Sequence, residues 1–201
     1  MRLIDQIDKD EIITIDEELS CEYEITKVLK KYPNDTVVFT NIKDCDMNII
    51  SGICNTRAKI AASVDTTVDN LTNSIIEATN NPTKITDIKD FSDVYANSMD
   101  ADLSKLPILK YYPEDMGKYI TAGVVIAKDP TTGQTNASIH RMVVNGKDEL
   151  GIRIVPRNLY TYYKKAEEMG KPLEIAIAIG LEASTLLATT TSISISDNVY
   201  P

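Results

Sequence analysis

The sequence of 201 residues has no tryptophan, two phenylalanines, one histidine and three cysteines. Cys21, Cys45 and Cys54 are odd in number and form no CxxC pair, so we expect reduced thiols in a cytoplasmic protein. With a single histidine, a zinc site is disfavoured. No apolar run approaches the length of a membrane span, and residues 1–18 lack the apolar core of a signal peptide. We therefore expect no membrane partner and no export.

Positive charge is also scarce: the chain has 21 lysines and arginines but 30 aspartates and glutamates, which gives a net charge of −9. This balance argues against a broad surface for nucleic acid or for an anionic membrane. A small anion site built from a few arginines is still possible. The hydrophobic content of 43% and the charged content of 25% are those of a globular protein of one large or two small domains.

Hydrophobic periodicity predicts two α/β parts, of which the first covers residues 1–104 and ends in a linker that begins near Phe91. In this part we expect helices at 21–31, 55–64 and 68–79 and strands at 36–40 and 83–88. The second part, residues 105–201, is predicted to have strands at 120–127, 134–144, 151–155 and 173–179 and helices at 157–169 and 181–188. The final stretch, 189–196, alternates between polar and apolar residues without a visible partner strand.

Three local patterns make the prediction for residues 105–201 more specific. The sequence Asp129-Pro130-Thr131-Thr132-Gly133 is a turn signal, so the strands on either side should form a β-hairpin. Residues 173–179 are almost entirely apolar, which predicts a buried strand. The group of Tyr111, Tyr112 and Met116 is expected to be packing rather than a substrate pocket, and the lysines and glutamates of residues 164–168 are expected to form a solvated helix face.

The segment from Thr135 to Met142 is the strongest candidate for a binding site, because it combines an amide, a hydroxyl, the only histidine and a guanidinium in a strand-like sequence. Alternate side chains of a strand share a face. One face would carry Asn136, Ser138 and His140, and the other Ala137, Ile139 and Arg141. Neither set is typical of a core or of a plain solvent surface, so the pattern indicates either a binding site or an edge strand with one polar side.

Six short motifs occur in an order and spacing that resemble one family. They are residues 55–57 (NTR), 106–108 (LPI), 113–121 (PEDMGKYIT), 136–142 (NASIHRM), 152–156 (IRIVP) and 177–180 (IAIG). The chain resembles the UbiD family of prenylated-FMN-dependent decarboxylases, and within it archaeal anhydromevalonate phosphate decarboxylases and 3-polyprenyl-4-hydroxybenzoate decarboxylase-like proteins. The resemblance covers the family's N-terminal domain and part of its central domain.

This resemblance implies an α+β fold in which the small N-terminal α/β domain precedes an incomplete, flavin-reductase-like split β-barrel. It implies prenylated FMN and Mn²⁺ as cofactors, with K⁺ as a further candidate cation. Asn136 matches the family's metal-ligating asparagine, and an amide oxygen suits a hard divalent cation that bridges to a phosphate. Asn158 stands where the family has a second metal ligand, a histidine, and Asp197 is the carboxylate nearest the expected third ligand, a glutamate.

Arg141 matches the family's catalytic arginine, which orients the substrate carboxylate with its planar guanidinium. The alternative is that Arg141 pairs with surface carboxylates. The resemblance further implies a set of cofactor-lining residues, namely Thr121, Ser138, Ile139, His140, Arg141, Arg153 and Asn158. His140 has the alternative of a structural histidine that is satisfied by its neighbours.

Two functions therefore stay open. The first is non-oxidative decarboxylation of a small unsaturated or aromatic carboxylic acid in isoprenoid or quinone-type biosynthesis, with the family's two catalytic glutamates expected beyond this chain. The second is a non-catalytic module that binds flavin or another anion, or that serves assembly. Because an incomplete barrel leaves a free sheet edge, we expect a homo-oligomer or a complementing C-terminal half.

Overall fold

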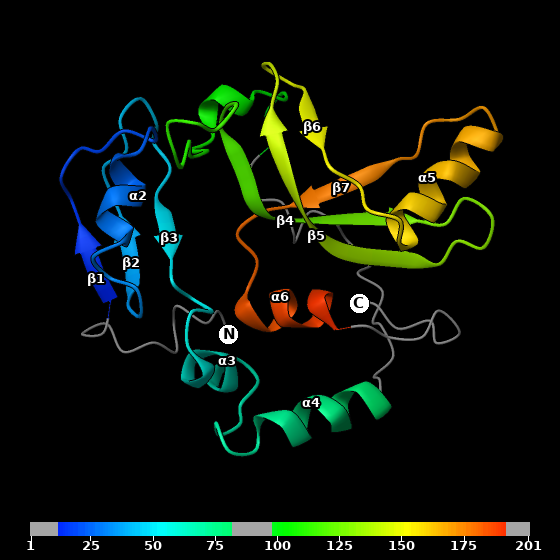
Figure 1. The fold of residues 1–201 in the computed structure, drawn as a ribbon, viewed down its shortest axis with the longest axis horizontal. Helices are drawn as coiled ribbons and strands as arrows, with labels where there is room; N and C mark the ends of the chain where they lie inside the picture. Colours follow the sequence, from blue (N-terminus) through cyan, green and yellow to red (C-terminus); the bar gives the residue numbers. More distant parts are fainter. Residues whose placement is uncertain (1–11, 82–97, 192–201) are drawn as a thin grey trace.

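The computed structural model describes residues 12–81 and 98–191, and these form two β-sheets with helices packed around them (Figure 1). The mixed α/β fold class expected from the sequence is confirmed. The strand expected at 83–88, most of the linker and the end of the chain lie outside the described residues. Within the described residues, no helix is both long and apolar enough to cross a membrane.

The first sheet has the order β1-β2-β3, in which β1 (Ile12–Ile15) runs parallel to β2 (Thr36–Phe39) and β3 (Ile49–Ser51) runs antiparallel to it. The helix α2 (Glu24–Leu29) connects the two parallel strands. β2 is central and its Val37 and Phe39 are fully buried, so the buried strand expected here is confirmed. Two further helices follow, α3 (Arg57–Ser63) and α4 (Leu71–Asn80), as the periodicity predicted.

The second sheet is antiparallel throughout and has the order β6-β5-β4-β7. Its strands are β4 (Tyr119–Lys128), β5 (Thr135–Val144), β6 (Leu150–Ile152) and β7 (Ile175–Ala178). The expected hairpin joins β4 to β5. In its turn, Oδ1 of Asp129 accepts the backbone N–H groups of Thr131 and Thr132 at 2.8 and 3.3 Å. Gly133 has a φ of 75°, a value that glycine adopts without strain.

The helix α5 (Asn158–Glu168) covers one face of this sheet, where its Leu159 and Tyr162 join Val125 and Met142 in a buried core. The helix α6 (Ala183–Thr190) contacts β5 and α3 and lies between the second sheet and α3 (Figure 1). The two helices expected at 157–169 and 181–188 are thus confirmed within two residues at each end.

The burial expected for residues 173–179 is wrong. The strand β7 forms, but Ile175 is 44% exposed and Ile179 is 54% exposed. The physical reason is position, because within the described residues β7 is an edge strand that pairs only with β4. An apolar run predicts a strand but does not determine how many neighbours the strand has. The strand expected at 151–155 is also shorter, and spans Leu150–Ile152.

The segment before β4 joins the two sheets. After the short 3-10 helix η3 (Leu103–Lys105), Ile108 enters the core of the second sheet, while its neighbour Leu109 enters the core of the first. The backbone of Lys110 then pairs with the chain before α2, donating to Cys21 and accepting from Tyr23 at 3.0 Å each. The segment from Ile108 to Lys110, just after the expected linker, is therefore packed against both units.

Candidate functional site

Three polar residues of β5, Asn136, Ser138 and His140, lie on the face that α5 covers. His140, Ser138 and Asn136 stand opposite Gly123, Val125 and Ala127 of β4, and paired residues of antiparallel strands share a face. Val125 and Ala127 belong to the buried core beneath α5. Asn136 is only 5% exposed and His140 only 9%. The alternation expected from the sequence is therefore observed, and its polar side is turned inward.

These buried polar groups form a continuous chain of hydrogen bonds. Nδ2 of Asn158, the first residue of α5, donates to Oδ1 of Asn136 at 3.1 Å, and Nδ2 of Asn136 donates to Oγ of Ser138 at 3.2 Å. Oγ of Ser138 lies 2.9 Å from Nε2 of His140, and Nδ1 of His140 lies 3.3 Å from the carbonyl oxygen of Arg153. We call these five residues the polar relay.

The carbonyl of Arg153, at one end of the polar relay, determines which groups donate and which accept along it. A backbone carbonyl only accepts, so Nδ1 of His140 carries the hydrogen, and in a neutral ring Nε2 then accepts from Ser138. The Ser138 oxygen is then free to accept from Asn136, whose own oxygen is directed at Asn158. This pattern is consistent with the neutral Nδ1–H tautomer of His140 and with its alternative reading as a satisfied structural histidine.

Arg141 and Ile139 lie on the opposite face of β5, where Arg141 is exposed and Ile139 is 38% exposed. The pairing of β4 with β5 shifts between Ile120 and Gly123, so that Thr121 and Ala122 both stand opposite Arg141. Such a bulge changes where side chains point. Both bulge residues are exposed, and Oγ1 of Thr121 lies 2.8 Å from the hydroxyl of Tyr111.

The expected site residues are thus divided between two faces rather than gathered in one cluster. Asn136, Ser138, His140 and Asn158 are joined on the covered face. Thr121, Ile139 and Arg141 belong to the opposite face, which we call the open face. Arg153 contributes its carbonyl to the polar relay, and its side chain is exposed. Among the residues that the structure describes, Arg141 forms no salt bridge, and Asp197 lies outside this part of the chain.

The amide groups of Asn136 and Asn158 are hydrogen-bonded to each other, which bears on whether they could share a hard cation. Neighbouring oxygens of an octahedral shell with metal–oxygen distances of about 2.1 Å lie about 3 Å apart. The amide groups of Asn136 and Asn158 meet at 3.1 Å, and rotation of the Asn158 amide would present two oxygens at that spacing. In the described part of the chain, no group of three or more His, Cys, Asp or Glu side chains could hold a metal ion.

Two features near this site were not predicted. Lys165, expected on a solvated face, donates to Asp129 at 2.6 Å and ties the hairpin turn to α5. Burial opposes the charge of Asp129, but the hydrogen bonds from Lys165 and from the turn N–H groups outweigh it and lower the Asp129 pKa. The second feature is the contact between Tyr111 and Thr121, which no pattern in the sequence indicates.

The packing expected for the aromatic cluster is wrong in part. Tyr111 packs against the first core, but Tyr112 is 50% exposed and Met116 is 89% exposed. The reason is that Met116 lies in the loop between Lys110 and β4, which offers its side chain no apolar surface in the described structure.

Comparison with known proteins identifies two family models in succession. Residues 7–79 match the 3-octaprenyl-4-hydroxybenzoate carboxy-lyase N-terminal domain, and residues 84–199 match the 3-octaprenyl-4-hydroxybenzoate carboxy-lyase Rift-related domain, named UbiD. The anhydromevalonate phosphate decarboxylase of Methanothermobacter thermautotrophicus is 53% identical over 92% of this chain.

Two solved structures of the UbiD-class enzyme HmfF from Pelotomaculum thermopropionicum are similar at 33% identity. One, with FMN, covers 94% of this chain with a TM-score of 0.89, and the other, an evolved dimeric form with prFMN, covers 92% with a TM-score of 0.86. The chain spans 44% of the length of each of these relatives.

Proposed function

Because the chain belongs to the UbiD family, we propose that it is the cofactor-binding part of a prenylated-FMN-dependent decarboxylase. The proposed reaction is the non-oxidative decarboxylation of a small unsaturated or aromatic acid, and the relative from Methanothermobacter favours anhydromevalonate phosphate and isoprenoid biosynthesis. Prenylated FMN, when bound, would supply the electron sink for this reaction. Residues 1–104 and 105–201 would form its two domains, in a cytoplasmic protein.

In this proposal Asn136 and Asn158 hold a divalent cation, Mn²⁺, through their amide oxygens. The 3.1 Å approach of the two amides is the single observation that carries the proposal. Both amides are neutral, so the cation would keep its full charge for the phosphate of the cofactor. Asp197 is proposed as a third ligand. Ser138 and His140 would hold Asn136 in orientation, since a ligand that is already hydrogen-bonded keeps its direction.

On the open face, Arg141 is proposed to orient the substrate carboxylate, and its lack of a salt bridge to a described carboxylate leaves the guanidinium available. Thr121 and Ile139 flank Arg141 on the same face and are proposed to line the flavin, with Arg153 nearby. Cofactor binding is the readout that tests this proposal, because the residues named here are proposed to hold the cofactor and its metal.

The test is to produce the chain together with a prenyl-flavin synthase, purify it, and measure retained flavin by absorbance with and without Mn²⁺. We expect retention that depends on Mn²⁺ and is lost in Asn136→Ala. The matched control is Asn48→Ala, because Asn48 is an exposed asparagine far from β5 in sequence. If Asn136→Ala retains as much flavin as Asn48→Ala does, Asn136 is not a ligand and the proposal fails.

A second candidate function is an assembly module without chemistry, and the exposed edge of the second sheet favours it. Among the described strands β7 pairs only with β4, and Ile175 of β7 and the following residue Ile179 are exposed. Unpaired apolar edges recruit further strands. We propose that this edge associates with a second copy or with a complementing C-terminal half. Sedimentation of the purified chain tests it: oligomers that Ile175→Lys dissociates support the proposal, and a wild-type monomer at micromolar concentration contradicts it.

A further inference from the structure

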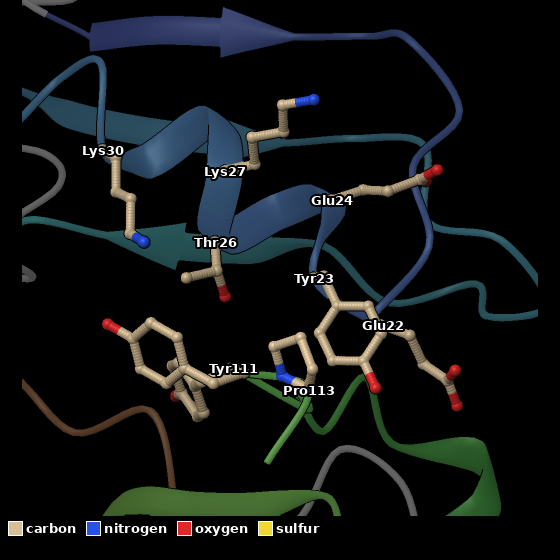
Figure 2. A pocket seen from close by; sticks show the side chains of 9 residues that line it. Glu22, Tyr23, Glu24, Thr26, Lys27, Lys30, Tyr111 and Pro113 are labelled. Atoms are coloured by element: carbon tan, nitrogen blue, oxygen red, sulfur yellow. The ribbon is translucent and has the colours of Figure 1, made fainter. Parts of the chain in front are cut away.

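A pocket of about 400 Å³ lies between α2 and the segment before β4, away from the polar relay. Figure 2 shows Tyr23 and Tyr111 on either side of it, with Pro113 between them and α2 above. Tyr112 also lines the pocket. Cavities of this size, with aromatic walls and a few polar groups, are typical of sites for small molecules.

The two ends of the pocket differ in charge. Lys30 extends from α2 on the Tyr111 side, whereas Glu22 stands at the other end, beyond Tyr23 (Figure 2). Nζ of Lys30 lies 4.9 Å from the ring centroid of Tyr112, and within the described residues it forms no salt bridge. An anionic group would therefore be attracted to the Lys30 end and repelled from the Glu22 end.

Thr26 supplies an independent sign of a missing partner. Its hydroxyl oxygen is the only buried side-chain oxygen or nitrogen in the described part of the chain without a hydrogen-bond partner. Thr26 lines the pocket, and its hydroxyl points from α2 toward Tyr111 and Pro113 (Figure 2). Buried polar groups in proteins are nearly always hydrogen-bonded, and an exception calls for an explanation.

We infer that this pocket binds a small aromatic carboxylate, with the ring between Tyr23 and Tyr111 and the carboxylate directed at Lys30. The flat aromatic and proline walls suit a planar ring, which contacts them by offset stacking or edge to face. The ammonium of Lys30 supplies the charge for the carboxylate. The Thr26 hydroxyl, which points toward Tyr111 and Pro113, supplies a hydrogen bond to the ligand.

The site is distinct from the one proposed for the cofactor, and the two are joined through one residue. Tyr111 forms a wall of the pocket, and its hydroxyl lies 2.8 Å from Thr121 on the bulge opposite Arg141. A ligand that moves the Tyr111 ring therefore changes a contact of the open face. The inference does not depend on the decarboxylase proposal, because the pocket is built from α2 and residues 111–113.

The test is an NMR titration of the ¹⁵N-labelled full chain with benzoate. We expect saturable shifts at residues 22–30 and 111–113, with a Kd below about 1 mM. Lys30→Gln should weaken binding roughly ten-fold, the size expected for losing a charge-assisted contact. The matched control Lys31→Gln changes a neighbouring exposed lysine that does not line the pocket, and should leave the affinity unchanged.

Two further measurements separate binding from folding and from the cofactor site. Thr26→Val removes an unpaired hydroxyl, so it should preserve the unfolding free energy while weakening benzoate binding, and Thr26→Ser should restore the affinity. Benzoate shifts that persist in Asn136→Ala support a separate site whether or not flavin binds. Absence of saturable shifts, shifts confined to β5, or equal losses in Lys30→Gln and Lys31→Gln would overturn the inference.

Discussion

The two faces of β5 differ in exposure around residues 138–141, although these residues alternate along one ten-residue strand. On the covered face, Asn136, Ser138 and His140 are enclosed by α5 and joined in one chain of hydrogen bonds. On the open face, Ile139 and Arg141 are exposed, whereas Ala137 nearer the hairpin turn is buried. The difference teaches that polarity alone does not determine burial, because polar groups can be enclosed where each finds a partner.

The largest expected loss of unfolding free energy comes from removing a buried side chain of the covered face. Met142 continues the covered face and is fully buried, whereas Ile139 on the open face is 38% exposed. Met142→Ala should lower the unfolding free energy by about 2–5 kcal/mol because it leaves a cavity, while Ile139→Ala should cost about 1 kcal/mol or less. Urea denaturation of both variants measures the contrast, and equal losses would contradict the assignment of the two faces.

The next effect is on the polar relay. Ser138→Ala leaves a donor on Asn136 and an acceptor on His140 without their partner, which should cost about 1–3 kcal/mol of unfolding free energy. The comparison on the open face is Thr121→Val, expected to cost about 0.5 kcal/mol or less because the Thr121 hydroxyl is exposed. If the two variants lose the same stability, the relay does not support the fold.

A smaller effect is expected for the salt bridge between Asp129 in the hairpin turn and Lys165 in α5. The pKa of Asp129 is lowered in the folded state, so its contribution is present above the pKa of an unfolded aspartate and is lost as the pH falls through the lower folded value. Asp129→Asn should cost about 1 kcal/mol at neutral pH. The difference in unfolding free energy between wild type and variant should shrink below about pH 4. A difference that grows toward acid pH would contradict the direction of the shift.

The smallest effect on stability is expected at Arg141. Because its guanidinium forms no salt bridge to a described carboxylate, Arg141→Ala should change the unfolding free energy by about 0.5 kcal/mol or less. Flavin retention after production with the prenyl-flavin synthase should nevertheless fall. Arg57→Ala, at another exposed arginine, serves as the control and should alter neither quantity. A large stability loss in Arg141→Ala would show that the residue is structural.

The sequence was sufficient to predict the β4–β5 hairpin and the alternation along β5. Both depend on local chemistry: the turn residues 129–133 favour one backbone path, and a strand alternates its side chains. The helices α2, α3 and α5 were predicted for the same reason, since periodicity and end signals are local.

What could not be predicted depends on contacts between distant residues. The sequence does not state that α5 covers the polar face, that β4 bulges opposite Arg141, or that Tyr111 reaches Thr121. The exposure of β7 was missed because an apolar run is the same whether it becomes a central strand or an edge. The roles proposed for Asn136 and Arg141 rest on family resemblance, which local physics does not supply.

The adjacent residues Ile108 and Leu109 limit how this protein can be recombined with its relatives. Ile108 belongs to the core of the second sheet and Leu109 to the core of the first. In a chimera joined between these two residues, each of them would come from a different parent than the core it packs against. A junction at 104/105 would also divide Leu103 from Leu106, which pack against the same core. A chimera that replaces either half would therefore need residues 103–111 and the core residues they contact in both sheets to come from the same parent. The two halves are not interchangeable modules.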